Sequence, residues 1–159
     1  MAIDMFLKLG EIIGESEAPD HIDEINISNF HWGLSNSVDM QRPGHDGKAN
    51  VGNIILTKSV CRATPVIMNM VTAGTHIPDA TIVALKAGGV EKLPYFVIKL
   101  EHIAVVDQQF DGESSGLIIE NITLNFSRVE LMYQQQEDDG TKKGGEVLKF
   151  YDALSGESG

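Results

Sequence analysis

Apolar and polar residues alternate along most of the chain, and in two long runs the alternation changes phase. In residues 21–35 the apolar positions are first odd and then even; in residues 117–135 they are first even and then odd. A shift of one residue turns every following side chain to the opposite face of a strand. Each run must therefore contain a bulge or leave one sheet and join another. The positions are Ile25, Ile27, Phe30, Trp32 and Leu34, then Ile122, Leu124, Phe126, Val129, Leu131 and Tyr133.

Strands that change sheets form the corners of small barrels and orthogonal sandwiches, so we expect a mainly β fold, a two-sheet β-barrel. Turn-rich segments at 41–48, 86–94, 110–116 and 137–146 separate the alternating runs. The chain has 159 residues, no internal repeat and no low-complexity linker, which predicts a single domain over 1–159 with a flexible C-terminal tail at 152–159. The predicted strands are 3–9, 21–35, 50–58, 80–87, 94–108, 117–135 and 146–151.

One segment departs from this alternation and predicts a short flanking α-helix at about residues 64–74. Thr64 is a suitable N-cap, and Pro65 suits the first helical position. The opposite face of this helix is also partly apolar, so the helix should pack against the sheet. Two roles stay open: a plain cover for the barrel, or an additional contact with a neighbouring chain. The core-facing stripe is Ile67, Met70 and Val71, ending at Gly74.

Composition excludes several classes of function. The net charge is −11 and no basic stripe occurs, so nucleic acid is not an expected partner. No apolar run approaches the roughly 20 residues that span a bilayer, and the N-terminus lacks the features of a signal peptide. We therefore expect a protein that folds in the cytoplasm and does not insert into membranes. The single cysteine, Cys61, can form no disulfide within the chain and is interpreted as a small buried apolar residue.

Catalytic and cofactor motifs are not found. GESSG at 112–116 has the Gly-x-Ser-x-Gly spacing, but it lies in a turn between two predicted strands and lacks the helix that follows a nucleophile elbow. The chain has no Ser-x-x-Lys motif, and RPGHDGK lacks the spacing of a phosphate loop. No cofactor, metal or enzymatic activity is therefore predicted, and a binding or structural role is favoured. The alternative is a small metal-binding or enzymatic β-barrel protein that uses His21 with Asp20 and Asp23. The other interpretation of those residues is a solvated strand edge.

A set of motifs, in one order along nearly the whole chain, resembles the hemolysin-coregulated protein (Hcp) family. Hcp is the tube protein of the bacterial type VI secretion system. No single motif is decisive, but the ordered set is specific. The motifs are MAIDMFLKLG followed by GES, HIDEI, FHWGLS, ILTKSVCRATPVIMNMVTAG, KAGG, and ENITLNFSRVELMY before DGTKKGG.

The resemblance implies subunits that form homohexameric rings around a lumen, and rings that stack into a tube. It implies three further partners: a spike protein at the tube tip, a contractile sheath, and small effector proteins carried in the lumen. The protein would be cytoplasmic before firing and then secreted from a Gram-negative bacterium without a signal peptide. A phage-type tail tube protein is the remaining alternative. Alternation does not reveal which strand face would line the lumen.

The resemblance also assigns a role to the long segment between the second and third predicted strands. By analogy with the family's long loop, these residues would contact a neighbouring subunit or the next ring. Relatives often carry a nearly pure glycine loop here, whereas Arg42, Pro43 and Asp46 make this loop stiffer and charged. The candidate residues are Met40, Gln41, Arg42, Pro43, Gly44, His45 and Asp46.

Overall fold

A computed structural model describes residues 3–42, 44, 46–86 and 92–159, and it is mainly β with one helix. The expected mainly β, barrel-like fold with one short helix is confirmed. In the described part of the chain, no helix is long and apolar enough to cross a membrane. The elements are β1 (Ile3–Leu9), β2 (Ile25–Ile27), β3 (Asn29–His31), β4 (Leu34–Asn36), β5 (Ala49–Val51), β6 (Ile54–Ser59), α1 (Thr64–Ala73), β7 (His76–Lys86), β8 (Pro94–Asp111), β9 (Ile119–Tyr133) and β10 (Val147–Asp152).

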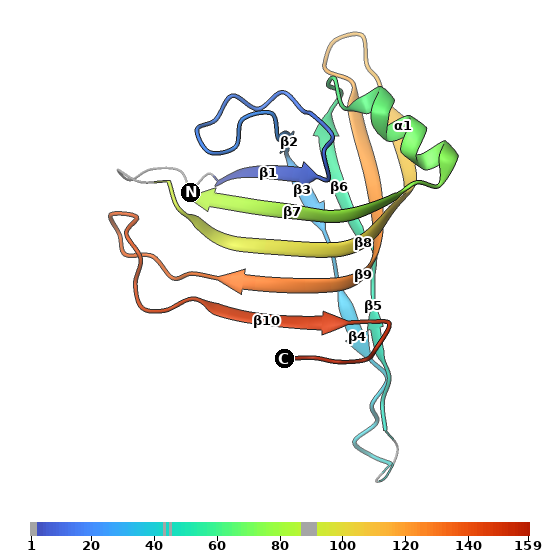
Figure 1. Cartoon of the computed structure of the whole chain (residues 1–159), viewed down its shortest axis with the longest axis vertical. Coiled ribbons are helices and arrows are strands. Elements are labelled where there is room, and N and C mark those ends of the chain that lie inside the picture. Colours follow the sequence, from blue (N-terminus) through green and yellow to red (C-terminus); the bar gives the residue numbers. More distant parts are fainter. Residues whose placement is uncertain (1–2, 43, 45, 87–91) are drawn as a thin grey trace.

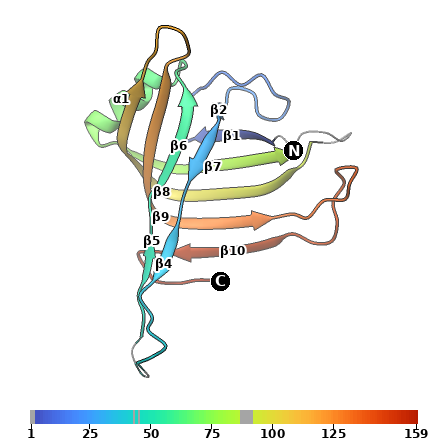
Figure 2. The same cartoon turned by 180° about the vertical axis from the view of Figure 1, so that it is seen from behind.

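One antiparallel sheet of eight strands forms the body of the molecule. Seven strands follow the order β2-β1-β7-β8-β9-β6-β3, and β10 pairs with β9 beside this path. In Figure 1, β1, β7, β8, β9 and β10 run across the view, while the far parts of β8 and β9 turn upward beside β6 and α1. β4 and β5 form a separate two-stranded ribbon that extends away from this body, as Figure 2 shows from behind. The predicted two sheets are therefore one bent sheet and a small ribbon.

The three central strands change their buried face along one line across the sheet, which we call the corner. Pro78 of β7 falls opposite His102 of β8, and His102 opposite Ser127 of β9. His102 has a left-handed backbone with φ of 54°, and Pro78 gives no N–H to the ladder. The long strands thus bend within one sheet rather than leaving it. The buried residues on either side of the corner are Ile77 and Ala80 in β7, Leu100 and Ile103 in β8, and Phe126 and Val129 in β9.

A second irregularity, a register shift between Val105 and Asp107, adds a bulge further along β8. It lies in the part of β8 that turns upward with β9. The bulge returns the even-numbered residues of β8 to the interior, so that Gln108 points inward toward α1. This bulge differs from the corner, where the pairing of β8 with β9 keeps one register.

The strand predicted over 21–35 is wrong as a single element. Residues 21–24 form a turn in which Asp23 has φ of 65°, and the rest divides among three short strands. β2 pairs with β1, β3 with β6, and β4 with β5. The phase change between Ile27 and Phe30 therefore marks the point where the chain exchanges one partner strand for another.

Apolar side chains are buried on both faces of the sheet near β1. The larger cluster fills the inside of the bend and includes Leu7 and Leu9. A smaller cluster on the other face joins Phe6 to residues of β7 and β8, and the loop at 10–24 covers it. In that loop the ring of His21 stacks on Phe6 with centroids 4.7 Å apart. The members of the smaller cluster are Phe6, Val83, Leu85 and Val97.

Residues after β10 turn back along its free edge. The N–H of Phe150 donates to the carbonyl of Gly159 at 2.8 Å, and Gly159 N–H returns a bond to Phe150 at 3.2 Å. Asp152 N–H donates to the carbonyl of Glu157 at 2.8 Å. The sequence predicted flexibility over 152–159; in the structure these residues follow a hydrogen-bonded path beside β10.

Replacing His102 by valine should lower the free energy of unfolding by about 1–2 kcal/mol, because a left-handed backbone strains a branched side chain. His102→Gly should keep or raise the stability, since glycine adopts positive φ freely. Urea unfolding at one fixed protein concentration measures both variants. An equal loss from both substitutions would contradict a backbone origin for the effect and assign it to the imidazole.

Candidate assembly surfaces

The loop between β4 and β5 contains the residues that the sequence assigned to an inter-subunit or inter-ring contact. Figure 1 places it at the far end of the ribbon, projecting away from the barrel. Met40 is 87% exposed, more than any other large apolar side chain in the described part of the chain. The assigned residues Met40, Gln41, Arg42, Gly44 and Asp46 are all exposed; Pro43 and His45 lie outside the described residues.

Hydrogen bonds order this loop near its base, and the first of the two described next joins its two sides. The hydroxyl of Ser37 accepts a bond from the N–H of Lys48 at 2.9 Å, and the side chain of Asn36 accepts one from Val38 N–H at 2.8 Å. Gly47 passes so close that a Cβ there would lie 2.0 Å from the Asn36 side-chain oxygen. Position 47 therefore requires glycine, because any side chain there would collide with the opposite side of the loop. The residues beyond this tight base are exposed to solvent.

The helix α1 shows its apolar residues to solvent as well as to the core. Gly74 ends the helix in a left-handed conformation, as predicted, and Pro65 lies in the first turn as the second helical residue instead of the predicted first. Ile67 is buried, whereas Val66 and Met68 are 41% and 55% exposed. The predicted N-cap is wrong by one residue: Ala63 occupies the N-cap without a side-chain bond, and Thr64 is the first helical residue.

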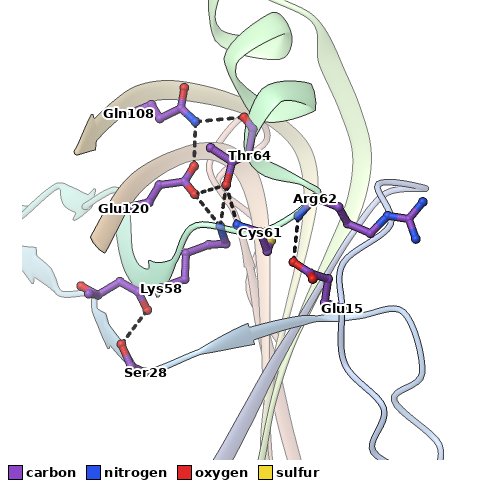
Figure 3. Close-up of polar contacts among 9 residues, drawn as sticks. Glu15, Ser28, Lys58, Cys61, Arg62, Thr64, Gln108 and Glu120 are labelled. Carbon is purple, nitrogen blue, oxygen red and sulfur yellow. Dashed lines mark hydrogen bonds and ion pairs between the residues drawn. The ribbon is translucent and has the colours of Figure 1, made fainter. Parts of the chain in front are cut away.

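Thr64 instead joins a buried polar network at the foot of α1, drawn in Figure 3. Its hydroxyl accepts a bond from Cys61 N–H at 3.0 Å and donates to Glu120 at 2.7 Å. Lys58 of β6 and Glu120 of β9 are direct cross-strand partners, form an ion pair, and have fully buried side chains. Gln108 of β8 donates to the second oxygen of Glu120 at 2.6 Å. This network joins three strands to the start of the helix.

Sequence reasoning missed this network, although a signal was present. Lys58 continues the apolar phase of Ile54 and Leu56, and Glu120 precedes Ile122 in the same phase. A charged residue in a core-facing phase must find a partner, since an isolated buried charge is strongly unfavourable. Two such residues of opposite charge on neighbouring strands indicate a buried pair.

The environment of Glu120 determines its protonation. Burial by itself would raise the pKa of this carboxyl, but hydrogen bonds from Lys58, Gln108 and Thr64 and the charge of Lys58 outweigh it. The pKa of Glu120 therefore lies below its ordinary value of 4.5. The carboxylate stays ionised at neutral pH and keeps its role as the common acceptor of the network.

The alternative metal site at His21, Asp20 and Asp23 does not assemble in this way. The His21 ring lies against Phe6, and its Nδ1 is 3.1 Å from the Glu24 carboxylate. Asp20 and Asp23 are exposed and both have positive φ. Among the described residues, no group of three or more histidine, cysteine, aspartate or glutamate side chains has an arrangement suited to a metal ion. His21, Asp20 and Asp23 instead belong to the loop at 10–24, which covers the smaller apolar cluster around Phe6.

Apolar side chains gather at both ends of the long axis of the molecule. Scattered exposed apolar residues are ordinary, but clusters at two distinct places indicate contact surfaces. Some exposed apolar residues are on the β8–β9 turn and the approach to α1, and others are on the ribbon; Figure 1 places these segments at opposite ends. The first comprises Val60, Phe110, Leu117 and Ile118, and the second Leu34, Val38 and Met40.

A bent β-barrel with one flanking helix, a projecting ribbon and apolar surfaces at both ends defines a subunit suited to assembly with other chains. Over residues 6–133 the sequence matches the family described as "Type VI secretion system effector, Hcp". The chain is 39% identical over 151 residues to protein Hcp1 of Pseudomonas aeruginosa, covering 92% of this chain and 93% of that protein. It belongs to the Hcp family of type VI secretion, as the ordered motifs predicted.

Solved structures agree with this assignment. The chain superposes on Hcp1 from Salmonella typhimurium with a TM-score of 0.84 and 28% identity, covering 99% of each chain. A structure described as a type six secretion system protein matches with a TM-score of 0.92 at 24% identity, over 99% of this chain and all of that one. The second match shows the fold, and the first also lies within the same family.

Breaking the buried ion pair from one side should destabilise the fold. Lys58→Met leaves Glu120 buried without its cation, which should cost about 3–5 kcal/mol of unfolding free energy. In the double variant Lys58→Met with Glu120→Leu no charge is left unpaired, and most of that loss should be recovered. Chemical denaturation of both variants measures the difference. A double variant as unstable as the single one would contradict this account of the pair.

Acid should weaken wild-type protein more than that double variant. The folded pKa of Glu120 is depressed, so the unfolded chain binds more protons here, and stability rises with pH. The stability that Glu120 contributes is fully present above about pH 4.5, and it is lost as the pH falls through the pKa of Glu120 in the folded protein. Asp139, whose pKa is lowered by hydrogen bonds from Thr141, remains in both proteins. Unfolding midpoints between pH 3 and pH 7 measure the difference, and parallel curves would contradict it.

Proposed function

We propose that this protein is the tube subunit of a type VI secretion system. Copies form hexameric rings around a lumen, and the rings stack into a tube. The observation that carries this proposal is the family match over residues 6–133, together with near full-length coverage of the Pseudomonas Hcp1 relative. The protein acts as a structural component rather than as an enzyme, and it needs no cofactor.

The surfaces of the chain support assembly. A ring forms when one patch on each subunit meets a different patch on the next and the rotation closes. Here the apolar residues at the two ends are different from one another, and α1, at the end of the β8–β9 turn, also exposes Val66 and Met68 (Figure 1). The residues Met40, Gln41, Arg42, Gly44 and Asp46, with Pro43 and His45 of the same loop, supply a contact to a neighbouring subunit or to the next ring.

The same proposal covers transport. The chain folds in the cytoplasm, and the tube leaves the cell through the secretion machinery. A contractile sheath propels the tube, and a spike protein sits at its tip. Small effector proteins travel in the lumen, whose lining the alternating strand faces supply. The partners are thus proteins, and neither nucleic acid nor membrane insertion is part of the proposed role.

Light scattering coupled to size exclusion tests ring formation on untagged protein. The expected mass is about six times the 17.3 kDa of one chain, because heterologous contacts that close give a ring of fixed size. Electron microscopy of the same fraction should show rings with an open centre. A strictly monomeric protein at every concentration and in every buffer tried would count against the proposal.

A further inference from the structure

The helix α1 is held on the sheet by few apolar side chains. Ile67 alone is buried among its ten residues, all of which the structure describes, and Ala63 just before the helix is also buried. Met70 and Val71 are half-buried, and most other positions of the helix are exposed. The helix packs mainly against β8. Its position therefore depends strongly on the polar network under its first turn.

The ammonium group of Lys58 lies directly beneath this first turn. Its Nζ donates to the hydroxyl of Thr64 at 3.3 Å and also forms the ion pair with Glu120. Both charged side chains are fully buried. The backbone of β6 is paired with β9 along its whole length, from Ile54 to Ser59, so the strands around the ion pair are fixed by the ladder. The first turn of α1, which is outside the sheet, is the side of the pair that can move aside most easily.

The charge of Glu120 is what allows this lysine to stay buried. One carboxylate oxygen accepts bonds from Lys58 and from Thr64, and the other accepts one from Gln108 at 2.6 Å. The amide of Gln108 also donates to the backbone carbonyl of Thr64 at 3.3 Å. Protonation of Glu120 would leave the Lys58 ammonium buried without a counter-charge, which is strongly unfavourable. The ammonium regains water when the first turn of α1 moves away.

In the described part of the chain, Lys58 is the one charged side chain that bonds to Glu120. Figure 3 shows Glu15 and the guanidinium of Arg62 lying apart from the Glu120 carboxylate. On β8, the acidic residues take the opposite phase to Gln108, which points to Glu120. The charge of this site therefore depends on one ion pair. The other titratable or charged groups on the elements packed here are Glu15, Cys61, Arg62, Asp107 and Asp111.

We propose that α1 is a latch that acid releases: when Glu120 loses its charge, the helix leaves the sheet while β7, β8 and β9 keep their pairing. Release would also free Val66 and Met68, the exposed apolar residues of the helix, from their fixed position. This inference goes beyond the proposed function, because it concerns a single chain and holds whether or not rings form.

The direction of the response to pH follows from the closed state. Burial would raise the pKa of Glu120, but hydrogen bonds from Lys58, Gln108 and Thr64 and the charge of Lys58 lower it overall. The open form therefore binds the proton more tightly than the closed form. Opening should increase as the pH falls through the lowered pKa, and α1 should stay closed at neutral pH.

Hydrogen exchange followed by mass spectrometry tests the latch. After correction for intrinsic exchange rates, wild-type amides in 64–73 should lose protection between pH 7 and pH 3, while those of β7, β8 and β9 stay protected. In the double variant Lys58→Met with Glu120→Leu, protection of α1 should not depend on pH. Ile67→Ala is the matched control. It weakens the apolar contact of the helix, so it should speed α1 exchange by the same factor at both pH values.

A neutral side chain at position 120 should open the latch without acid. Glu120→Gln keeps the shape of the side chain but leaves Lys58 unpaired, so at pH 7 it should speed α1 exchange about 100-fold, because breaking a buried pair from one side is strongly destabilising. Adding Lys58→Met should restore most of the protection, since no ammonium then stays buried. If Glu120→Gln does not fold, the pH series on wild-type protein still decides.

The outcomes separate this inference from the proposed function. A loss of protection that is equal in α1 and in the strands would overturn the latch, as would full protection of α1 at pH 3. The same acid response in wild type and in the double variant would also overturn it. Light scattering on the same samples reports the oligomeric state. Wild-type rings whose α1 stays protected in acid would overturn the latch and leave the tube subunit standing. A monomer at every pH whose α1 opens in acid would support the latch and count against the proposed function.

Discussion

The bend of β7, β8 and β9 at the corner determines the rest of the architecture. Each strand buries one set of alternating residues before the corner and the other set after it, so a single sheet encloses the core from two directions. The positive φ of His102 and the missing N–H of Pro78 make this turn possible at neighbouring positions of adjacent strands. Without it, β6 could not pair with β9 while β1 pairs with β7, and α1 would have no bent surface to cover.

The buried network at the foot of α1 then fixes the helix on that bent sheet. An apolar contact alone would hold the helix with little directional preference, whereas hydrogen bonds to Glu120 require a defined position of Thr64. Buried charges of this kind often add little net stability compared with apolar residues, but they restrict the geometry. Because Val66 lies on the same short helix, the network also determines the position of the exposed apolar residues of α1.

Much of the fold could be predicted from the sequence, because alternation reports which side chains face the core. The phase change in residues 117–135 coincides with the corner, and Pro65 and Gly74 marked the helix ends to within one residue. The division of 21–35 into three strands could not be predicted, since it depends on which distant strand each piece pairs with. The Lys58–Glu120 pair joins residues 62 positions apart, so it does not follow from local sequence.

The hydrogen-bonded segment beside β10 has a consequence for the unassembled chain. An open strand edge is a template for uncontrolled pairing, and within the described part of the chain β10 has only β9 as a partner strand in the main sheet. The bonds to Phe150 and Asp152 occupy backbone groups on that edge. The covered edge thus protects the unassembled chain against aggregation, and its excess of negative charge acts in the same direction.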